Sequence, residues 1–292
     1  MSFADPLAPP ALGAVGLRRR YPGSFRRLYR GEMRLVLRRR RNLALLFVLA
    51  VVPVFIGVAV KLSTPRRGDG PQFIGEVTGN GLFLVFTALT VSLPFFLPLV
   101  IGVVSGDSIA GEANIGTLRY LLTVPVTRSR VLAVKALGVA TFTALAVLTV
   151  AGVALVTGGL LFGLQRVTLL SGDTVSIGNG LLRAAGVAAF VIVALFGLAA
   201  GGLFVSTLTE NPIGAMATTI GLAVFSALLD AVPQLNAIHP WLLTHNWLGF
   251  GELLRSTVDG GQLLRWSALH LAYAAVFLSL AWARLRTKDV TS

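Results

Sequence analysis

Residues 43–62 read LALLFVLAVVPVFIGVAVKL, a run in which only Lys61 carries a charge. The hydrocarbon core of a bilayer is about 30 Å thick, and about 20 apolar residues in a helix cross it. This stretch is therefore predicted to span a membrane. Five more stretches of the chain have the same character. The six predicted spans are residues 43–62, 81–104, 131–162, 181–205, 212–232 and 263–282.

The composition of the whole chain supports this prediction. Of its 292 residues, 55% are hydrophobic and 13% are charged, and the mean hydropathy is +0.80. A soluble domain has about 25% charged residues, so this chain has too little polar surface for a water-soluble fold. We predict an all-α integral membrane protein with a tail and interfacial helix over residues 1–42, a six-span domain over 43–284, and a second tail over 285–292.

The basic residues predict how the chain is oriented. With six spans both termini lie on one side, and that side receives 18 of the 25 Lys and Arg residues, 11 of them in the first 42 residues. The positive-inside rule then places both termini in the cytoplasm. Arg20, Arg128 and Lys288 are expected there, while Arg66, Asp173 and Arg255 are expected outside. A cleaved signal peptide is disfavoured because more than 40 residues precede the first apolar run.

Two segments beside the spans have an amphipathic pattern. Residues 21–42 place Tyr29, Glu32 and Met33 on one stripe and several arginines on the other, which predicts a helix lying in the membrane interface. A contact with a partner protein is equally compatible with that pattern. The second segment, residues 105–130, reads SGDSIAGEANIGTLRYLLTVPVTRSR, and its middle, 109–122, is predicted to form a short amphipathic helix. It is far longer than a connection requires, so we expect a partner to dock there.

The second segment resembles the signature that follows the second span in the ABC type-2 permease family. The matching residues are Glu112, Gly116, Thr117, Leu118, Leu121, Leu122, Pro125, Val126, Arg128 and Lys135. The resemblance implies a permease subunit in the cell (plasma) membrane, which pairs with a second permease subunit as a homodimer or heterodimer. It also implies that the pair docks two copies of a separate ABC ATPase subunit through a coupling helix.

The resemblance also assigns roles within this segment. Glu112 is expected to pair with a basic residue of the ATPase, Gly116 to allow close backbone approach, and Ile115 and Leu118 to form an apolar knob. In the competing interpretation, Glu112 only stabilises the N-terminus of the short helix and Leu118 rests on lipid. The predicted ATPase-contact residues are Gly111, Glu112, Ile115, Gly116, Thr117, Leu118 and Arg119.

The sequence lacks the motifs of several enzyme classes. A Walker loop needs Gly-Lys-Ser/Thr, and no glycine precedes Lys61, Lys135 or Lys288, so ATP and Mg are expected on the partner. The histidines do not have His-Glu-x-x-His spacing, and cysteine is absent. No catalytic, cofactor-binding or metal-binding residue is predicted, although His239, His245 and Glu252 could meet a metal or cargo. With no soluble domain, nucleic acid is not expected as a partner.

The spans themselves suggest the kind of cargo. Ion-coupled transporters and channels place charged groups at mid-membrane, whereas Asp230, Glu210 and Lys135 lie near the ends of the predicted spans. Pro94 and Pro98 predict a bend in the second span. The resemblance implies that the second and fifth spans line a dimer cleft. Candidate pathway residues are Thr90, Phe95, Phe96, Thr218 and Phe225.

The last outer loop, residues 233–262, is semi-apolar. We predict one or two short interfacial or re-entrant helices there, with Trp241 and Trp247 as interface anchors.

The resemblance at residues 105–130, the missing nucleotide site and the six-span topology together predict the permease of an ATP-driven exporter that moves a lipophilic or amphipathic compound or lipid outward by alternating access. The alternative is the membrane subunit of an ABC-type assembly, maturation or signalling system that acts on an outer-surface protein.

Overall fold

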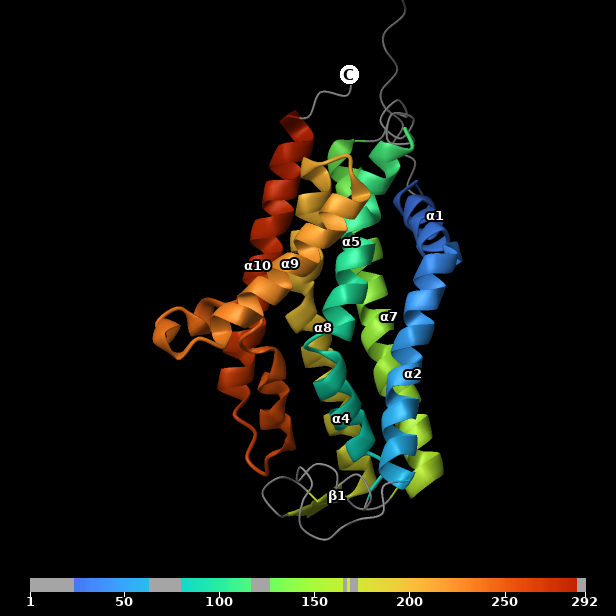
Figure 1. Cartoon of the computed structure of the whole chain (residues 1–292), viewed down its shortest axis with the longest axis vertical. Coiled ribbons are helices and arrows are strands. Elements are labelled where there is room, and N and C mark those ends of the chain that lie inside the picture. Colours follow the sequence, from blue (N-terminus) through green and yellow to red (C-terminus); the bar gives the residue numbers. More distant parts are fainter. Residues whose placement is uncertain (1–23, 63–79, 117–126, 165–166, 169–172, 288–292) are drawn as a thin grey trace, which may run out of the picture.

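A computed structural model describes residues 24–62, 80–116, 127–164, 167–168 and 173–287 (Figure 1). In this part of the chain, six helices are long and apolar enough to cross a membrane. These six helices confirm the predicted all-α fold. The described residues also include one short antiparallel pair of strands, β1 and β2, with two residues in each strand. The elements are α1 (Ser24–Arg38), α2 (Arg40–Leu62), α4 (Phe83–Ser92), α5 (Phe96–Asn114), α7 (Arg128–Phe162), β1 (Val167–Thr168), β2 (Thr174–Val175), α8 (Ile177–Leu208), α9 (Pro212–Asp230), η1 (Pro233–Leu235), η2 (His239–Trp241), η3 (Trp247–Leu254) and α10 (Gly260–Thr287).

The helices form an upright bundle in which α1 and the end of α10 lie at the same end (Figure 1). We call this the terminal end; β1 marks the opposite end, here called the hairpin end. Helices α5 and α8 are mostly buried, whereas α2, α9 and α10 leave most of their surfaces exposed. Helix α5 packs against both α8 and α9, and α8 packs against α10. The core therefore centres on α5 and α8.

The second predicted span is wrong in extent, because α4 and α5 replace one continuous helix over 81–104. Pro94 and Pro98 have no N–H with which to continue the helical ladder, and the chain breaks between Ser92 and Phe96. The predicted bend is thus confirmed. Helix α5 then runs on to Asn114, so residues 109–114 complete this helix and do not begin a separate one. Residues 117–122 of the predicted amphipathic helix lie outside the described part.

Helix α1 has the predicted amphipathic pattern, and its inner stripe contacts the protein. The Tyr29 hydroxyl lies 2.7 Å from Oγ1 of Thr141 on α7. Glu32 is buried, while the arginines of the opposite face are exposed. A side chain at Gly138 of α7 would meet Cγ of Glu32 at 3.0 Å, so this glycine makes room for the acid. Phe25, near the start of α1, is 38% exposed.

Glycines on α8 allow neighbouring helices to approach closely. A Cβ at Gly197 would lie 3.0 Å from Leu243 and 3.2 Å from Tyr273 of α10. A Cβ at Gly202 would lie 2.0 Å from the Ser105 hydroxyl of α5. Small residues commonly serve this purpose between membrane helices. These contacts place the glycines against other parts of the same chain.

The segment between α9 and α10 contains the three 3₁₀ helices η1, η2 and η3, of which η1 packs against α9 and η3 against α8 and α10. Trp241 is 68% exposed, in keeping with the predicted anchor. Trp247 is 3% exposed and packs in the core, so its predicted role as an interface anchor is wrong. Its large ring fills space between helices because η3 packs against α8.

We predict that Gly158→Ala destabilises the protein. A Cβ at Gly158 would lie 2.1 Å from the carbonyl oxygen of Gly81, and backbone atoms cannot move aside cheaply. Overpacking of this kind costs roughly 1–3 kcal/mol, which thermal unfolding in detergent should show as a lower Tm. Gly152→Ala on the same helix is the control, because nothing lies within 4 Å of its Cβ position. Equal Tm values for the two variants would contradict the close α4–α7 contact.

Candidate functional site

Three charged side chains meet near the terminal end of the bundle, and we call them the charge cluster: Glu32, Glu112 and Lys135. They come from α1, α5 and α7 respectively. The Lys135 ammonium donates a hydrogen bond to Glu112 and lies 2.9 Å from Oε2 of Glu32. The cluster therefore joins three helices through one cation.

The charge cluster is almost removed from water. The exposed fractions of the side chains are 5% for Lys135, 10% for Glu32 and 7% for Glu112. Burial disfavours the ionised carboxylate and raises the pKa of Glu32 above 4.5, while the positive charge of Lys135 acts in the opposite direction. A buried charge is tolerated when a partner and hydrogen bonds compensate its lost hydration. Each carboxylate here depends on the same lysine.

A second ionic contact lies one helical turn earlier on α5. Asp107 is paired with Arg39 and with Arg41, whose Nη2 lies 2.5 Å from its Oδ2. Arg39 is the residue between α1 and α2, and Arg41 lies in the first turn of α2. The Asp107 side chain is 8% exposed, whereas the arginines remain 38% and 42% exposed. The acid thus fixes the α1–α2 junction to α5.

Ser206 of α8 holds the backbone of α5 between these two ionic contacts. Its hydroxyl donates to the carbonyl of Gly106 at 2.6 Å and accepts from the N–H of Ala110 at 2.8 Å. An α-helix ordinarily joins such a carbonyl and N–H directly. The Ser206 hydroxyl therefore links the backbone of α5 to α8.

The predicted ATPase-contact residues begin in this region. Gly111 and Glu112 face their own chain, because a Cβ at Gly111 would lie 2.3 Å from Oδ1 of Asp107 and Glu112 is bound to Lys135. Glu112 lies near the C-terminal end of α5, so the interpretation that it stabilises a helix N-terminus is wrong. Ile115 is 69% exposed.

Gly116 follows the end of α5 with a φ of +72°, a conformation that glycine adopts without strain. Its N–H donates to the carbonyl of Ala113, as at many helix C-termini. This local requirement explains a glycine at this position. Thr117, Leu118 and Arg119 lie outside the described residues.

Arg128 fixes the chain where the described structure resumes. Its guanidinium donates to the carbonyl of Leu285 at 2.7 Å and to that of Arg286 at 3.1 Å, near the end of α10. A cation bound to carbonyls at a helix C-terminus is favourable. The described chain therefore stops just after α5 and resumes at a contact between α7 and α10.

The five predicted pathway residues lie in different parts of the bundle. Phe95 and Phe96 lie at the α4–α5 break with their rings edge to face, 5.5 Å apart, and Phe95 is 58% exposed. Thr90 and Thr218 donate to carbonyls of their own helices, Phe86 and Gly214. Their hydroxyls are thereby partly satisfied within the helix.

Phe225 of α9 lines an apolar groove of about 230 Å³, which also involves η2 and α10. Ser226 provides a hydroxyl in the lining, whose other members are Leu222, Leu229, Trp241, Leu242, Leu243, Tyr273 and Phe277. Among the five candidates, Phe225 is thus the one that the structure places in a groove. Sequence reasoning missed the contribution of Trp241 and Tyr273 to this wall.

His239 and His245, the two histidines named from sequence as possible metal ligands, lie close together. The acid beside them is Asp230 and not Glu252. Nitrogen and oxygen atoms of Asp230, His239 and His245 lie within 4.8 Å of one another. Glu252, the acid named from sequence, lies 3.5 Å from Arg255 in an ion pair. This group lies at the end of α9, away from the charge cluster at the terminal end.

We predict that Lys135→Met destabilises the protein by about 3–5 kcal/mol, because it leaves two buried carboxylates without their cation. Thermal unfolding of the purified chain measures this loss. The control is Lys61→Met, an exposed lysine, which should change stability by less than about 0.5 kcal/mol. Adding Glu32→Gln and Glu112→Gln to Lys135→Met should recover much of the loss. A triple variant no more stable than Lys135→Met would contradict the assigned cause.

Comparison with known protein families gives this architecture a context. The chain matches the family described as ABC-2 family transporter protein over residues 27–290. No curated protein matches the chain. The match covers every described helix except the first residues of α1. Members of this family are membrane permeases that lack the ATPase domain and work with an ATPase subunit. The chain therefore belongs to the ABC-2 family, as a multi-pass membrane permease subunit of an ABC-2 type transporter.

Proposed function

We propose that this permease exports a lipophilic or amphipathic compound or a lipid, powered by a separate ATPase subunit that docks at the terminal end. Two permease chains and two ATPase chains would form the working unit. The observation that carries the proposal is the arrangement around residues 117–126. The exposed apolar residue Ile115 follows the end of α5, three residues after Glu112 of the charge cluster, which ties α1, α5 and α7 together.

The docking step follows from this arrangement. Ile115 offers a small exposed apolar surface at the end of α5, and Leu118 would add to it. Force applied at Ile115 reaches Glu112 within the last turn of α5, and Lys135 connects Glu112 to α7 and α1. We assign Glu112 to transmission inside the permease, and Ile115, Gly116, Thr117, Leu118 and Arg119 to the ATPase contact.

The character of the cargo follows from the groove beside Phe225. Its lining is almost entirely carbon, and its polar contribution comes from groups such as Ser226 and the Tyr273 hydroxyl. Apolar pockets with a few polar groups suit lipophilic ligands. The groove opens where α9, η2 and α10 meet, so an apolar molecule could reach it from the bilayer.

Purification from native membranes tests the main assignment. The tagged full-length permease should bring with it a nucleotide-binding chain, and the complex should hydrolyse ATP while the permease alone should not. Hydrolysis by the isolated permease, or a native complex without a nucleotide-binding chain, would overturn the assignment.

The docking assignment predicts that Ile115→Asp combined with Leu118→Asp weakens ATPase binding by about thirtyfold, because desolvated interface anchors contribute about 2 kcal/mol or more. Binding of the purified ATPase to permease in nanodiscs measures this change. Val258→Asp is the control, since it adds an acidic side chain at an exposed apolar residue before α10. A double variant that binds ATPase with parental affinity would show that docking occurs elsewhere.

The orientation predicts opposite labelling of two engineered cysteines. Helix α10 contains 28 residues, and at about 1.5 Å per residue it separates Thr257 from Arg284 by more than the thickness of the hydrocarbon core. In intact cells an impermeant thiol reagent should label Thr257→Cys and leave Arg284→Cys unlabelled until the membrane is opened. The chain has no native cysteine to interfere. Labelling of Arg284→Cys from outside would reverse the proposed orientation.

A further inference from the structure

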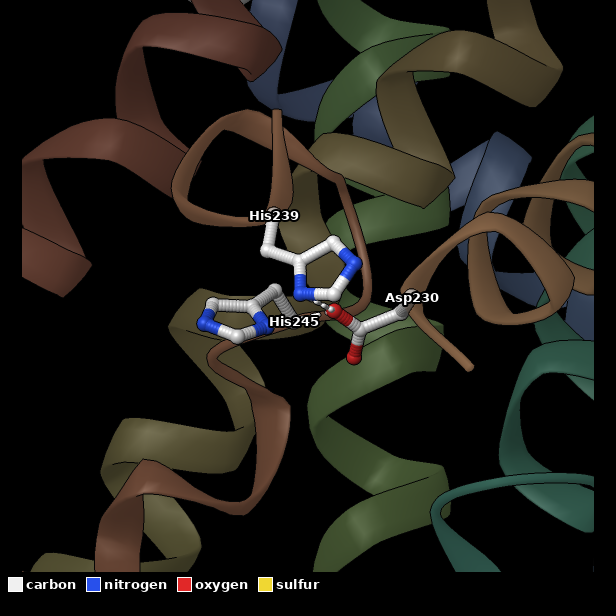
Figure 2. Close-up of side chains that lie close together, drawn as sticks. All are labelled: Asp230, His239 and His245. Atoms are coloured by element: carbon white, nitrogen blue, oxygen red, sulfur yellow. Dashed lines mark hydrogen bonds and ion pairs between the residues drawn. The ribbon is translucent and has the colours of Figure 1, made fainter. Parts of the chain in front are cut away.

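We propose that Asp230, His239 and His245 form a binding site for a divalent transition-metal ion of the zinc type. Figure 2 shows the three side chains pointing toward one another, with Asp230 at the end of α9. His239 belongs to η2, and His245 lies just before η3. The evidence for this metal site does not depend on the proposed cargo or on the proposed ATPase docking.

The hydrogen bonding of His239 prepares one ring nitrogen for a metal. Its Nε2 lies 3.1 Å from the carbonyl oxygen of Val232. A carbonyl can only accept, so Nε2 carries the hydrogen and, in the neutral ring, Nδ1 has a free lone pair. Metal-binding histidines characteristically donate their other N–H to a carbonyl or carboxylate, which fixes the ring orientation. Here that orientation aims Nδ1 at Asp230.

The spacing of the ligand atoms is close to what a small cation requires. Oδ1 of Asp230 lies 2.6 Å from Nδ1 of His245 and 3.9 Å from Nδ1 of His239. Tetrahedral zinc bonds of about 2.0–2.1 Å place neighbouring ligand atoms about 3.3 Å apart. The first of these distances must lengthen and the second must shorten by roughly 0.6–0.7 Å, and the two histidine nitrogens, which lie within 4.8 Å of each other, must also come to about 3.3 Å, changes that side-chain rotation can provide.

The chemistry of the ligands selects the class of ion. Two imidazoles and one carboxylate suit zinc and its transition-metal neighbours, whereas calcium and magnesium prefer oxygen ligands throughout. When the ion binds, the neutral His245 ring changes tautomer by proton exchange with solvent: Nδ1 loses its hydrogen to water and Nε2 takes one from water, so Nδ1 can bind the metal. The side chains are 29% exposed for Asp230, 12% for His239 and 35% for His245. Solvent can therefore reach the site and supply water as a fourth ligand.

The position of the site suggests what the ion does. Residues Trp241, Leu242 and Leu243 lie between the two histidine ligands and line the apolar groove. The Thr244 hydroxyl already contacts Ser226 of α9 at 2.9 Å. A metal joining Asp230 to both histidines would add a stronger connection between α9 and residues 239–245. The ion would thus hold one wall of the groove in place.

Zinc binding by the full-length protein tests the proposal directly. The protein is purified in detergent with a tag that contains no histidine, and a chelator removes any bound metal. Calorimetry then measures binding of zinc chloride, and elemental analysis counts the zinc that stays bound to the protein. We expect one ion per chain and a higher Tm with zinc than without. His239→Asn and Asp230→Asn should each weaken binding at least about tenfold and remove the rise in Tm.

Two variants control for binding elsewhere on the protein. Asp259→Asn removes an exposed carboxylate before α10, and His270→Gln removes the third histidine of the chain, which lies on α10. Both should keep one zinc ion per chain, and no cysteine is present to bind it instead. Absence of saturable zinc binding by the parental protein would overturn the proposal, whether or not any variant folds. Equal affinity in the parental protein and His239→Asn would also overturn it.

Discussion

The structure at the terminal end depends on one lysine that lies between two carboxylates in a nearly dry environment. Without Lys135, Glu32 and Glu112 would repel each other and lack compensation for their lost hydration. With it, α1, α5 and α7 share a single point of contact. The Asp107 contact with Arg39 and Arg41 adds a second connection between α5 and the start of the chain. The apolar bundle alone would leave α1 held by few specific contacts.

This arrangement also explains why an amphipathic helix at the start of the chain packs where it does. The arginines of α1 face away from the protein, and its inner stripe meets α7 at Tyr29 and Glu32. Gly138 leaves the space that the Glu32 side chain occupies. A helix that lay only on lipid would need no such matched glycine. The helix is therefore part of the permease body and contributes directly to the charge cluster.

Local features of the fold were predictable because they depend on neighbouring residues. Apolar runs of sufficient length identify α2, α7, α8, α9 and α10, and Pro94 with Pro98 identifies the break before α5. The charge cluster was not predictable in the same way. Lys135 is separated by 23 residues from Glu112 and by 103 from Glu32, and no periodicity connects them. The one available signal was that an acid and a lysine occur at the ends of adjacent apolar helices, where charges rarely remain unpaired.

The same limit applies to the groove and to the histidine site. The two tryptophans between α9 and α10 have similar surroundings in the sequence, yet Trp247 lies in the core and Trp241 at the groove. Tertiary packing of the 3₁₀ helices decides between these positions. His245 meets Asp230 because a turn brings the chain back to the end of α9, which residue spacing alone does not reveal.

The Ser206 hydroxyl has a mechanical consequence for α5. A helix resists bending through its row of backbone hydrogen bonds, and here a carbonyl and an N–H of that row also bond to one side chain of α8. The stretch from Asp107 to Asn114 is therefore coupled to the rest of α5 and to α8 at the same point. A twisting force on this stretch therefore acts on both α5 and α8, which are buried helices. Because α5 packs directly against α9, and α8 leads into α9 through only three residues, Thr209 to Asn211, a displacement at the end of α5 has two short routes to α9.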